Sequence, residues 1–433
     1  MVSVTSHRPA MARSLTSIPD DIVYIIIDEL STDPRTLKQC SLVSRAFLPH
    51  SHKHIFSAIQ LDHPKQCRGL YRVLTNNPGL ACYIRTLIVI ANVQVEFRGR
   101  NWVTIENTLP GVLPMLHNLQ SLTIRNLFER PLLWDVLPIE LRSALLDLTS
   151  TTLSSITLDR LGNWPIMHFS QFIHLKRLRF LDISLDAGNL LLTQKMQALL
   201  GGPRRKAAEG QLESLEIERS TAYGGPLVKA LIHSGSSLGI SKLRHLTLHG
   251  ACGFAETIMS ASSQALEVIV WKALGEEKDG PFQPGPTSLG VMSNLRSLVI
   301  QTKFARGQAY DPLPWLSQAL ANTTITERCP LEDLTILIDF YGVWRFSITQ
   351  RDTHDLYEYS VWRELDDALT RPGVFNRLSH VKVGLRIGGG VETFKLLAAK
   401  KMPRLMAAGI LQMVYSDNFV GVTSPVFNRT FVS

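Results

Sequence analysis

One short pattern recurs along this chain and limits what it can fold into: an apolar residue, two variable residues, a second apolar residue, one variable residue and a third apolar residue. The alternation at its fourth and sixth positions is typical of a half-buried β-strand, and its first position anchors the turn into that strand. Segments with helical spacing, such as 190–200 and 313–320, lie between copies. The ten copies are 84–89, 119–124, 153–158, 178–183, 212–217, 243–248, 266–271, 295–300, 331–336 and 378–383.

Strands that alternate with helices and stack side by side predict a solenoid with a parallel sheet and outer helices, and the pattern resembles leucine-rich repeats. The copies start 23 to 47 residues apart, by subtraction of their first positions. Regular repeats keep a period of about 20–29 residues. We therefore expect an irregular array with long loops, for example at 276–286 and 341–359, and a last strand at 409–414.

The third, fifth and seventh positions of each copy are expected to point away from the helices, onto the concave face of the solenoid. Concave faces of this kind are extended protein-binding surfaces. A face that is merely solvated remains the alternative, and the carboxylates favour a basic target. The candidate target-binding residues are Asp182, Glu216, Glu218, His245 and His249.

The segment 15–61 has the spacing of three short helices. Asp33 is expected to cap the second helix, with Pro34 at its first position. The first helix is apolar around more than the roughly 100° that a surface helix needs to pack on its own core. Three short helices also bury little surface by themselves. The surplus apolar face and the small size both predict a protein partner.

The same segment resembles the F-box, in the form abundant in fungi. Ile18-Pro19 stands where the family has Leu-Pro, and the run from Val43 to Phe47 matches its central signature, with Phe where Trp is commoner. The resemblance implies docking onto the small adaptor subunit of cullin-based ubiquitin ligases. The residues that would form the core and the adaptor-facing surface, without a division between the two, are Pro19, Ile22, Ile26, Leu30, Leu37, Val43, Arg45 and Phe47.

The fold class expected is α/β: a disordered tail at 1–14, a helical F-box-like module at 15–61, and an irregular leucine-rich-repeat solenoid at 62–433. The resemblance implies a substrate-receptor subunit of an SCF-type ubiquitin ligase, which serves ubiquitin-dependent degradation and leaves catalysis to other subunits. Its partners would be the adaptor, a cullin held through it, and a target protein. The alternative is a repeat scaffold without a ligase role, whose N-terminal helices cap the array.

Composition excludes several other classes. The chain is 45% hydrophobic and 19% charged, which suits a folded core, and no run approaches the roughly 18 apolar residues of a membrane span. Five scattered cysteines favour a reduced cytoplasmic or nuclear protein. The net charge of +8 is modest, and the basic run at 204–206 has no interleaved aromatic residue, so we expect no nucleic-acid partner.

Motifs that would support chemistry are incomplete. His50 and His54 share a helix face but lack a nearby Cys or acid that completes a metal set. The glycines at 388–390 lack the Gly-Lys-Ser/Thr ending of a phosphate loop. Ser234 follows His233 outside any Gly-x-Ser-x-Gly context. We therefore expect no catalytic site, no cofactor and no metal.

Overall fold

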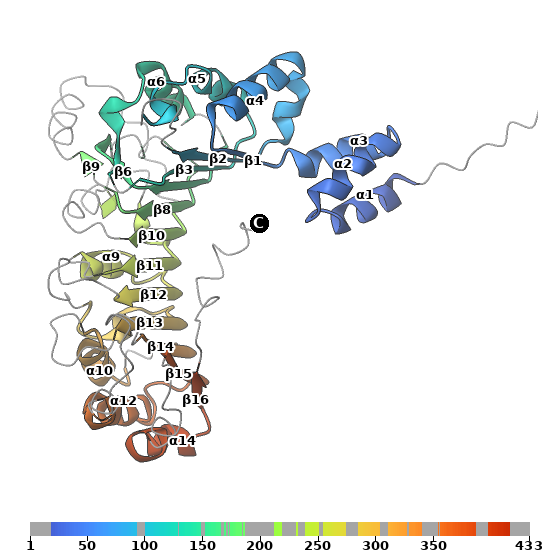
Figure 1. The fold of residues 1–433 in the computed structure, drawn as a ribbon. Coiled ribbons are helices and arrows are strands. Elements are labelled where there is room, and N and C mark those ends of the chain that lie inside the picture. Colours follow the sequence, from blue (N-terminus) through green and yellow to red (C-terminus); the bar gives the residue numbers. More distant parts are fainter. Residues whose placement is uncertain are drawn as a thin grey trace, which may run out of the picture. The chain divides into compact units, whose positions relative to one another are not determined.

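The computed structural model divides into two compact units, Met1–Ile59 and Gln60–Ser433, which are described separately (Figure 1). The tail, Ile18, the basic run at 204–206, the Ser234 segment, the glycines at 388–390 and most of the two predicted loops lie outside the described residues. The structure describes residues 19–92, 100–128, 130–148, 152–165, 169, 172, 174–183, 185–186, 212–218, 231–232, 239–250, 254–273, 285–303, 311–326, 329–339, 354, 356–386 and 397–415.

From residue 19 onward, where its description begins, the first unit contains three helices, α1 (Asp20–Glu29), α2 (Pro34–Val43) and α3 (Phe47–Ile55). The Asp33 carboxylate accepts hydrogen bonds from the backbone N–H groups of Arg35 and Thr36, at 3.0 and 3.2 Å. This cap satisfies donors that the first turn of α2 leaves without a helical partner. The predicted cap at Asp33 and the helical start at Pro34 are therefore confirmed.

The core of this unit is small. Val23, Ile27 and Leu37 are buried, and partly buried apolar side chains pack around them. Val23 and Ile27 are four residues apart on α1 and so share one face of the helix. The face of α1 that carries Val23 and Ile27 packs into the core, and the neighbouring face of the helix does not.

The second unit is built on a parallel β-sheet. Twelve strands follow one another in chain order across it, and every strand pair whose register is described is parallel. The strands are β1 (Ala58–Leu61), β2 (Thr86–Ala91), β3 (Ser121–Asn126), β5 (Ser155–Asp159), β8 (Arg177–Leu181), β10 (Ser214–Glu218), β11 (His245–His249), β12 (Val268–Ala273), β13 (Ser297–Lys303), β14 (Asp333–Asp339), β15 (His380–Arg386) and β16 (Leu411–Tyr415).

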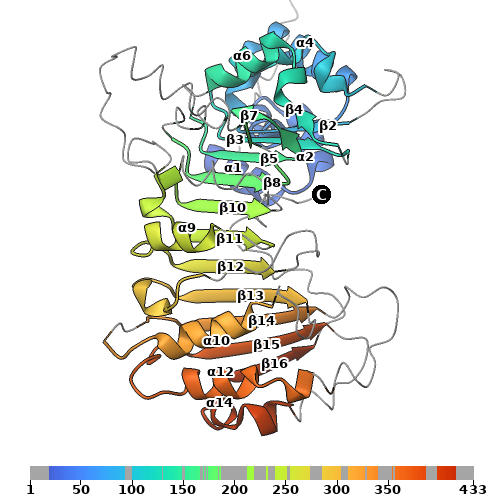
Figure 2. The same cartoon turned by 90° about the vertical axis from the view of Figure 1, so that its left-hand side faces the viewer.

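Helices in the connections pack along one side of this sheet, as α9, α10 and α12 do in Figures 1 and 2. The α-helices are α4 (Pro64–Asn76), α5 (Leu109–Val112), α6 (Ile139–Asp147), α9 (Ala255–Ala261), α10 (Leu313–Asn322), α12 (Val361–Leu369) and α14 (Pro403–Ala407). Short strands β4 (Leu132–Leu133) and β6 (Leu161–Gly162) pair with each other, as do β7 (Trp164–Pro165) and β9 (Leu185–Asp186). The fold is α/β, with N-terminal helices and then a long all-parallel, leucine-rich-repeat-like solenoid, as predicted.

The repeated apolar positions form the core of the second unit. In the copy that contains β10, for example, Leu212, Leu215 and Ile217 are fully buried. A parallel strand exposes alternate side chains to opposite faces of the sheet. The fourth and sixth positions therefore face the helices, and the third and fifth face the other way. The first position lies in the turn before the strand and is buried with the fourth and sixth. The predicted last strand also forms, as β16.

One predicted copy is out of register. The sequence pattern placed its first position at Leu178, but Leu178 pairs with Leu215, which is the fourth position of the next copy. The copy therefore begins at Leu175, and Phe180 is buried in the core rather than exposed on the concave face. Leucine at 175, 178 and 181 fits two registers equally well by pattern, and strand pairing selects one of them.

The corrected register reveals a turn that recurs after the strands. Arg160, Asp182 and Gly250 directly follow β5, β8 and β11, and all three have positive φ, at 53°, 52° and 78°. Their N–H groups donate to a carbonyl of the next strand, and Asp182 does so to Glu218 at 2.9 Å. Asp182 thus lies in a left-handed turn beyond the end of β8. The prediction that its side chain lies at a concave strand position is wrong.

Candidate functional site

An apolar face on the first unit is open to solvent. Ile22, Ile25 and Ile26 share one side of α1, and Ile25 is 60% exposed. Leu42 and Val43 at the end of α2 are 81% and 73% exposed. Scattered exposed apolar residues are ordinary, but several together on one helix face mark a binding surface. Three of these exposed residues share one face of α1 and two lie at the end of α2, and we call the five together the apolar face.

The structure separates the core residues from the surface residues of the predicted F-box set, which the sequence pattern could not do. Among the predicted F-box residues, Leu37 is buried, and Leu30 and Phe47 pack against the core. The remaining five are exposed to solvent, namely Pro19, Ile22, Ile26, Val43 and Arg45. Ile25 and Leu42, which also belong to the apolar face, were not among the F-box residues predicted from the sequence. Helical spacing from the buried Val23 and Ile27 could have identified Ile25.

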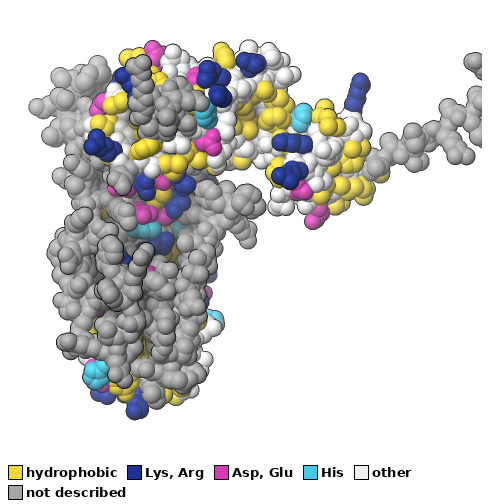
Figure 3. Space-filling model, in the orientation of Figure 1, with side chains coloured by type: hydrophobic (Ala, Val, Ile, Leu, Met, Phe, Trp, Pro, Cys, Tyr) yellow, Lys and Arg dark blue, Asp and Glu magenta, His cyan; other side chains and the backbone are white. Residues whose placement is uncertain are grey.

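Charged side chains meet on the second unit, on the sheet face opposite the helices. Oε2 of Glu216 lies 2.9 Å from Nε of Arg179 on the neighbouring strand β8. Oε1 of Glu216 lies 3.2 Å from Nε2 of His249 on β11, and Nδ1 of the same ring lies 3.6 Å from Oε2 of Glu218. His249 thus stands between two carboxylates. Figure 3 shows acidic, basic and histidine side chains gathered over this part of the sheet.

Burial and charge oppose each other at Glu216, whose side chain is 4% exposed. Burial by itself would raise the pKa of its carboxyl group, but the hydrogen bond with His249 and the charge of Arg179 outweigh burial and hold that pKa below its ordinary value. At Lys272 on β12, burial lowers the pKa of the ammonium group against the attraction of Glu216 and Glu218. The buried carboxylate is therefore ionised and already neutralised by protein cations.

The cluster continues towards β3. Asp159 on β5 lies 2.9 Å from Nε of Arg125. Burial raises the pKa of the Asp159 carboxyl group, with a smaller opposing effect from Arg125, and the nearby charge of Glu218 acts in the same direction as burial. Charges of both signs thus alternate across the sheet, and the face as a whole is not acidic.

Four of the five predicted target-binding residues lie on this face, and three of them, Glu216, Glu218 and His249, come together. Glu216, Glu218, His245 and His249 lie on adjacent strands β10 and β11, at concave positions. Glu216 is buried and forms ion pairs with Arg179 and His249, whereas the side chain of Glu218 is 31% exposed. Sequence reasoning missed Arg179 and Lys272. Arg179 was missed because the copy containing it had been assigned the wrong register.

The same cluster could hold a cation. One ligand atom from each of Glu216, Glu218 and His249 can be chosen so that all three lie within 4.8 Å of one another. It is the one such group of three or more metal-ligating side chains in the part of the chain that the structure describes. His54, by contrast, pairs with Asp28 at 2.7 Å in the first unit.

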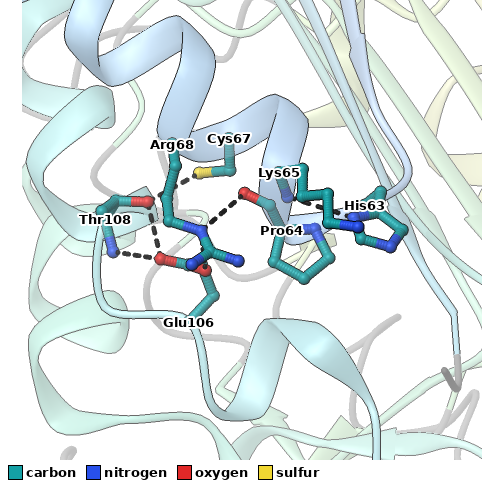
Figure 4. Close-up of polar contacts among 7 residues, drawn as sticks. All are labelled: His63, Pro64, Lys65, Cys67, Arg68, Glu106 and Thr108. Carbon is teal, nitrogen blue, oxygen red and sulfur yellow. Dashed lines mark hydrogen bonds and ion pairs between the residues drawn. The ribbon is translucent and has the colours of Figure 1, made fainter. Parts of the chain in front are cut away.

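A second polar cluster, around Cys67 on α4, is structural (Figure 4). Thr108 donates to Oε1 of Glu106 at 2.8 Å and lies 3.3 Å from Sγ of Cys67. Arg68 lies 3.5 Å from the other oxygen of Glu106. Burial raises the pKa of the Cys67 thiol to about 11, against a smaller opposing effect from Thr108. A protonated, buried thiol is a poor nucleophile.

We therefore predict that Cys67 resists alkylation in the native protein. Its pKa of about 11 against a usual 9.0 lowers the thiolate fraction roughly a hundredfold at pH 8. Cys82, which is exposed, should react first. Iodoacetamide labelling followed by peptide mass spectrometry measures both rates, with urea-unfolded protein as the control. Equal native rates at Cys67 and Cys82 would contradict the buried cluster.

The sequence matches no family model, and no curated protein matches it significantly. Among the described residues, no helix has the length and apolar character needed to cross a membrane.

Proposed function

We propose that this chain is the substrate-receptor subunit of an SCF-type, cullin-based ubiquitin ligase. The observation that carries the proposal is the apolar face of the first unit: Ile22, Ile25 and Ile26 with Leu42 and Val43. The F-box-like pattern at residues 15–61 supplies the kind of partner, the small adaptor subunit.

Physical chemistry supports a partner at this face. Each exposed Å² of apolar surface costs about 25 cal/mol relative to burial. The unit has few residues with which to cover these side chains itself, since its core contains three fully buried apolar side chains. Docking would bury the face and stabilise the small unit at the same time.

The second unit would hold the target. Its concave face presents partly exposed polar groups, among them the Glu218 carboxylate and the His245 ring, beside the ion pairs that Glu216 makes. A rigid, preorganised surface loses little freedom on binding. In this proposal the chain performs no chemistry; it holds the target close to the ubiquitin-charged enzyme.

The test is adaptor binding by the full chain, measured by calorimetry or surface plasmon resonance. A variant with Ile25→Glu and Leu42→Glu should bind at least 100-fold more weakly, because each change places a charge in a desolvated contact. Ile139→Glu is the matched control, since Ile139 is equally exposed, at 67%, but lies in the second unit. That control should leave affinity unchanged.

Both variants change exposed residues, so each should keep the wild-type circular dichroism spectrum and melting temperature. Absence of binding by folded wild-type protein would remove the ligase role and leave a repeat scaffold. Equal losses in the Ile25/Leu42 variant and in the Ile139 control would show that the apolar face is not the docking site.

A further inference from the structure

His249 lies between two carboxylates. Its Nε2 faces Oε1 of Glu216 at 3.2 Å, within hydrogen-bonding distance, and its Nδ1 faces Oε2 of Glu218 at the longer distance of 3.6 Å. Imidazole nitrogen and carboxylate oxygen are both ligands of metal ions. The three side chains therefore bring possible metal ligands together in one cluster.

We infer that Glu216, Glu218 and His249 form a binding site for a single zinc ion on the concave face of the solenoid. The ion binds Nε2 of His249 and one carboxylate oxygen of each glutamate, and so joins strands β10 and β11. The site goes beyond the proposed ligase function and does not depend on it.

The donor set suits zinc. Zn²⁺ binds histidine nitrogen and carboxylate oxygen at about 2.0–2.2 Å, and in a tetrahedral arrangement such donors lie roughly 3.3 Å apart. The 3.2 Å between Nε2 of His249 and Oε1 of Glu216 matches that spacing. All three donors lie within 4.8 Å of one another. Glu218, with a 31% exposed side chain, can close the remaining gap by changing rotamer.

Arg179 orients the site. It holds Oε2 of Glu216 at 2.9 Å and leaves Oε1 directed at His249. Outer-shell partners commonly fix ligating carboxylates in this way. The two glutamates are also two residues apart on one strand and on the same face. His249 follows Leu248, the residue that pairs with Ile217 between the two glutamates. The three ligands are therefore positioned by backbone pairing rather than by a loop.

The Lys272 ammonium group opposes zinc binding, and its removal tests the proposed site. Its ammonium group interacts with both Glu216 and Glu218, so it competes with a metal for the same carboxylates. Removing it without removing volume, in Lys272→Met, should strengthen zinc binding about tenfold, as expected from one unit charge at close range in a partly buried site. Non-specific zinc binding at surface histidines would show no such gain.

The experiment is zinc titration of the purified full chain by calorimetry, with elemental analysis after dialysis. We expect one saturable zinc ion per chain, and Ca²⁺ should not compete because it prefers six to eight oxygen ligands. His249→Gln and Glu218→Gln should each weaken binding at least 100-fold. His245→Gln, at the other end of the same strand and on the same face, is the control and should bind zinc as wild type does.

Two results would overturn the inference. The first is the absence of saturable zinc binding by folded wild-type protein at zinc concentrations up to about 100 µM, which corresponds to less than about 6 kcal/mol. The second is binding that His249→Gln and Glu218→Gln leave unchanged. Glu218 is partly exposed, so its variant remains informative if the more buried His249→Gln misfolds.

Discussion

Replacing Trp271 with Ala should destabilise the centre of the solenoid by about 3–5 kcal/mol, the usual cost of removing a large buried aromatic side chain. Trp271 is fully buried at the sixth position of its repeat. Its Nε1–H donates to the Gly250 carbonyl at 3.2 Å, and its ring lies 5.2 Å from that of Trp315 on α10. One side chain therefore connects the turn after β11, strand β12 and helix α10 of the next repeat.

Hydrogen exchange is the suitable measurement, because a long repeat array need not unfold in a single step. Amides of β11, β12 and α10 should lose protection in the Trp271→Ala protein, while those of β2 and β3 should change little. Trp271→Phe is the control: it keeps much of the ring packing and loses the hydrogen bond, so it should cost about 1–2 kcal/mol. Uniform loss of protection along the whole array would argue against nearest-neighbour coupling.

Replacing Arg371 with Met should cost about 2–4 kcal/mol near the end of the array, since hydrogen bonds from a charged group are worth more than neutral ones. Arg371 follows α12, and its guanidinium group donates to carbonyls at the end of α10. The distances are 2.8 Å to Ala321 and 3.0 Å to Thr323, and Leu320 accepts as well. A cation at a helix C-terminus also interacts favourably with the helix dipole.

The planar fork of arginine is essential to this cap. Arg371→Lys keeps the charge but offers a single ammonium group, so it should recover less than half of the loss. Arg363→Met, at an exposed position of α12, is the matched control and should stay within about 0.5 kcal/mol of wild type. Thermal melting and exchange of the α10 amides report both effects. An equal result for Arg371→Met and Arg363→Met would show that the cap contributes nothing.

These two contacts show how an irregular array is held together. The repeats vary in length, so helices are not stacked with a constant spacing, and individual side chains bridge the gaps. Asp366 on α12 does the same at the next junction, where its carboxylate accepts the backbone N–H groups of Arg404 and Leu405 at 3.1 and 2.8 Å. Such bridges are tertiary features that the repeat pattern does not contain.

The sequence by itself determined the parallel solenoid, because a buried first, fourth and sixth position in each copy can only be satisfied by stacked strands. It also determined the cap at Asp33, since a cap depends on residues within one turn. The resemblance to fungal F-box sequences predicted that these helices bind a partner, but did not separate the side chains of the core from those of the surface.

Only the tertiary structure decided which apolar residues are core and which are exposed. Val23 and Ile25 look alike in sequence, and packing alone buries the first and exposes the second. Strand pairing likewise chose between Leu175 and Leu178 as the start of one copy, and so placed Arg179 beside Glu216. The charged cluster depends on that choice, because its members come from separate strands. A local pattern fixes the face on which a side chain lies, whereas the neighbours it meets there are set by the pairing of distant segments.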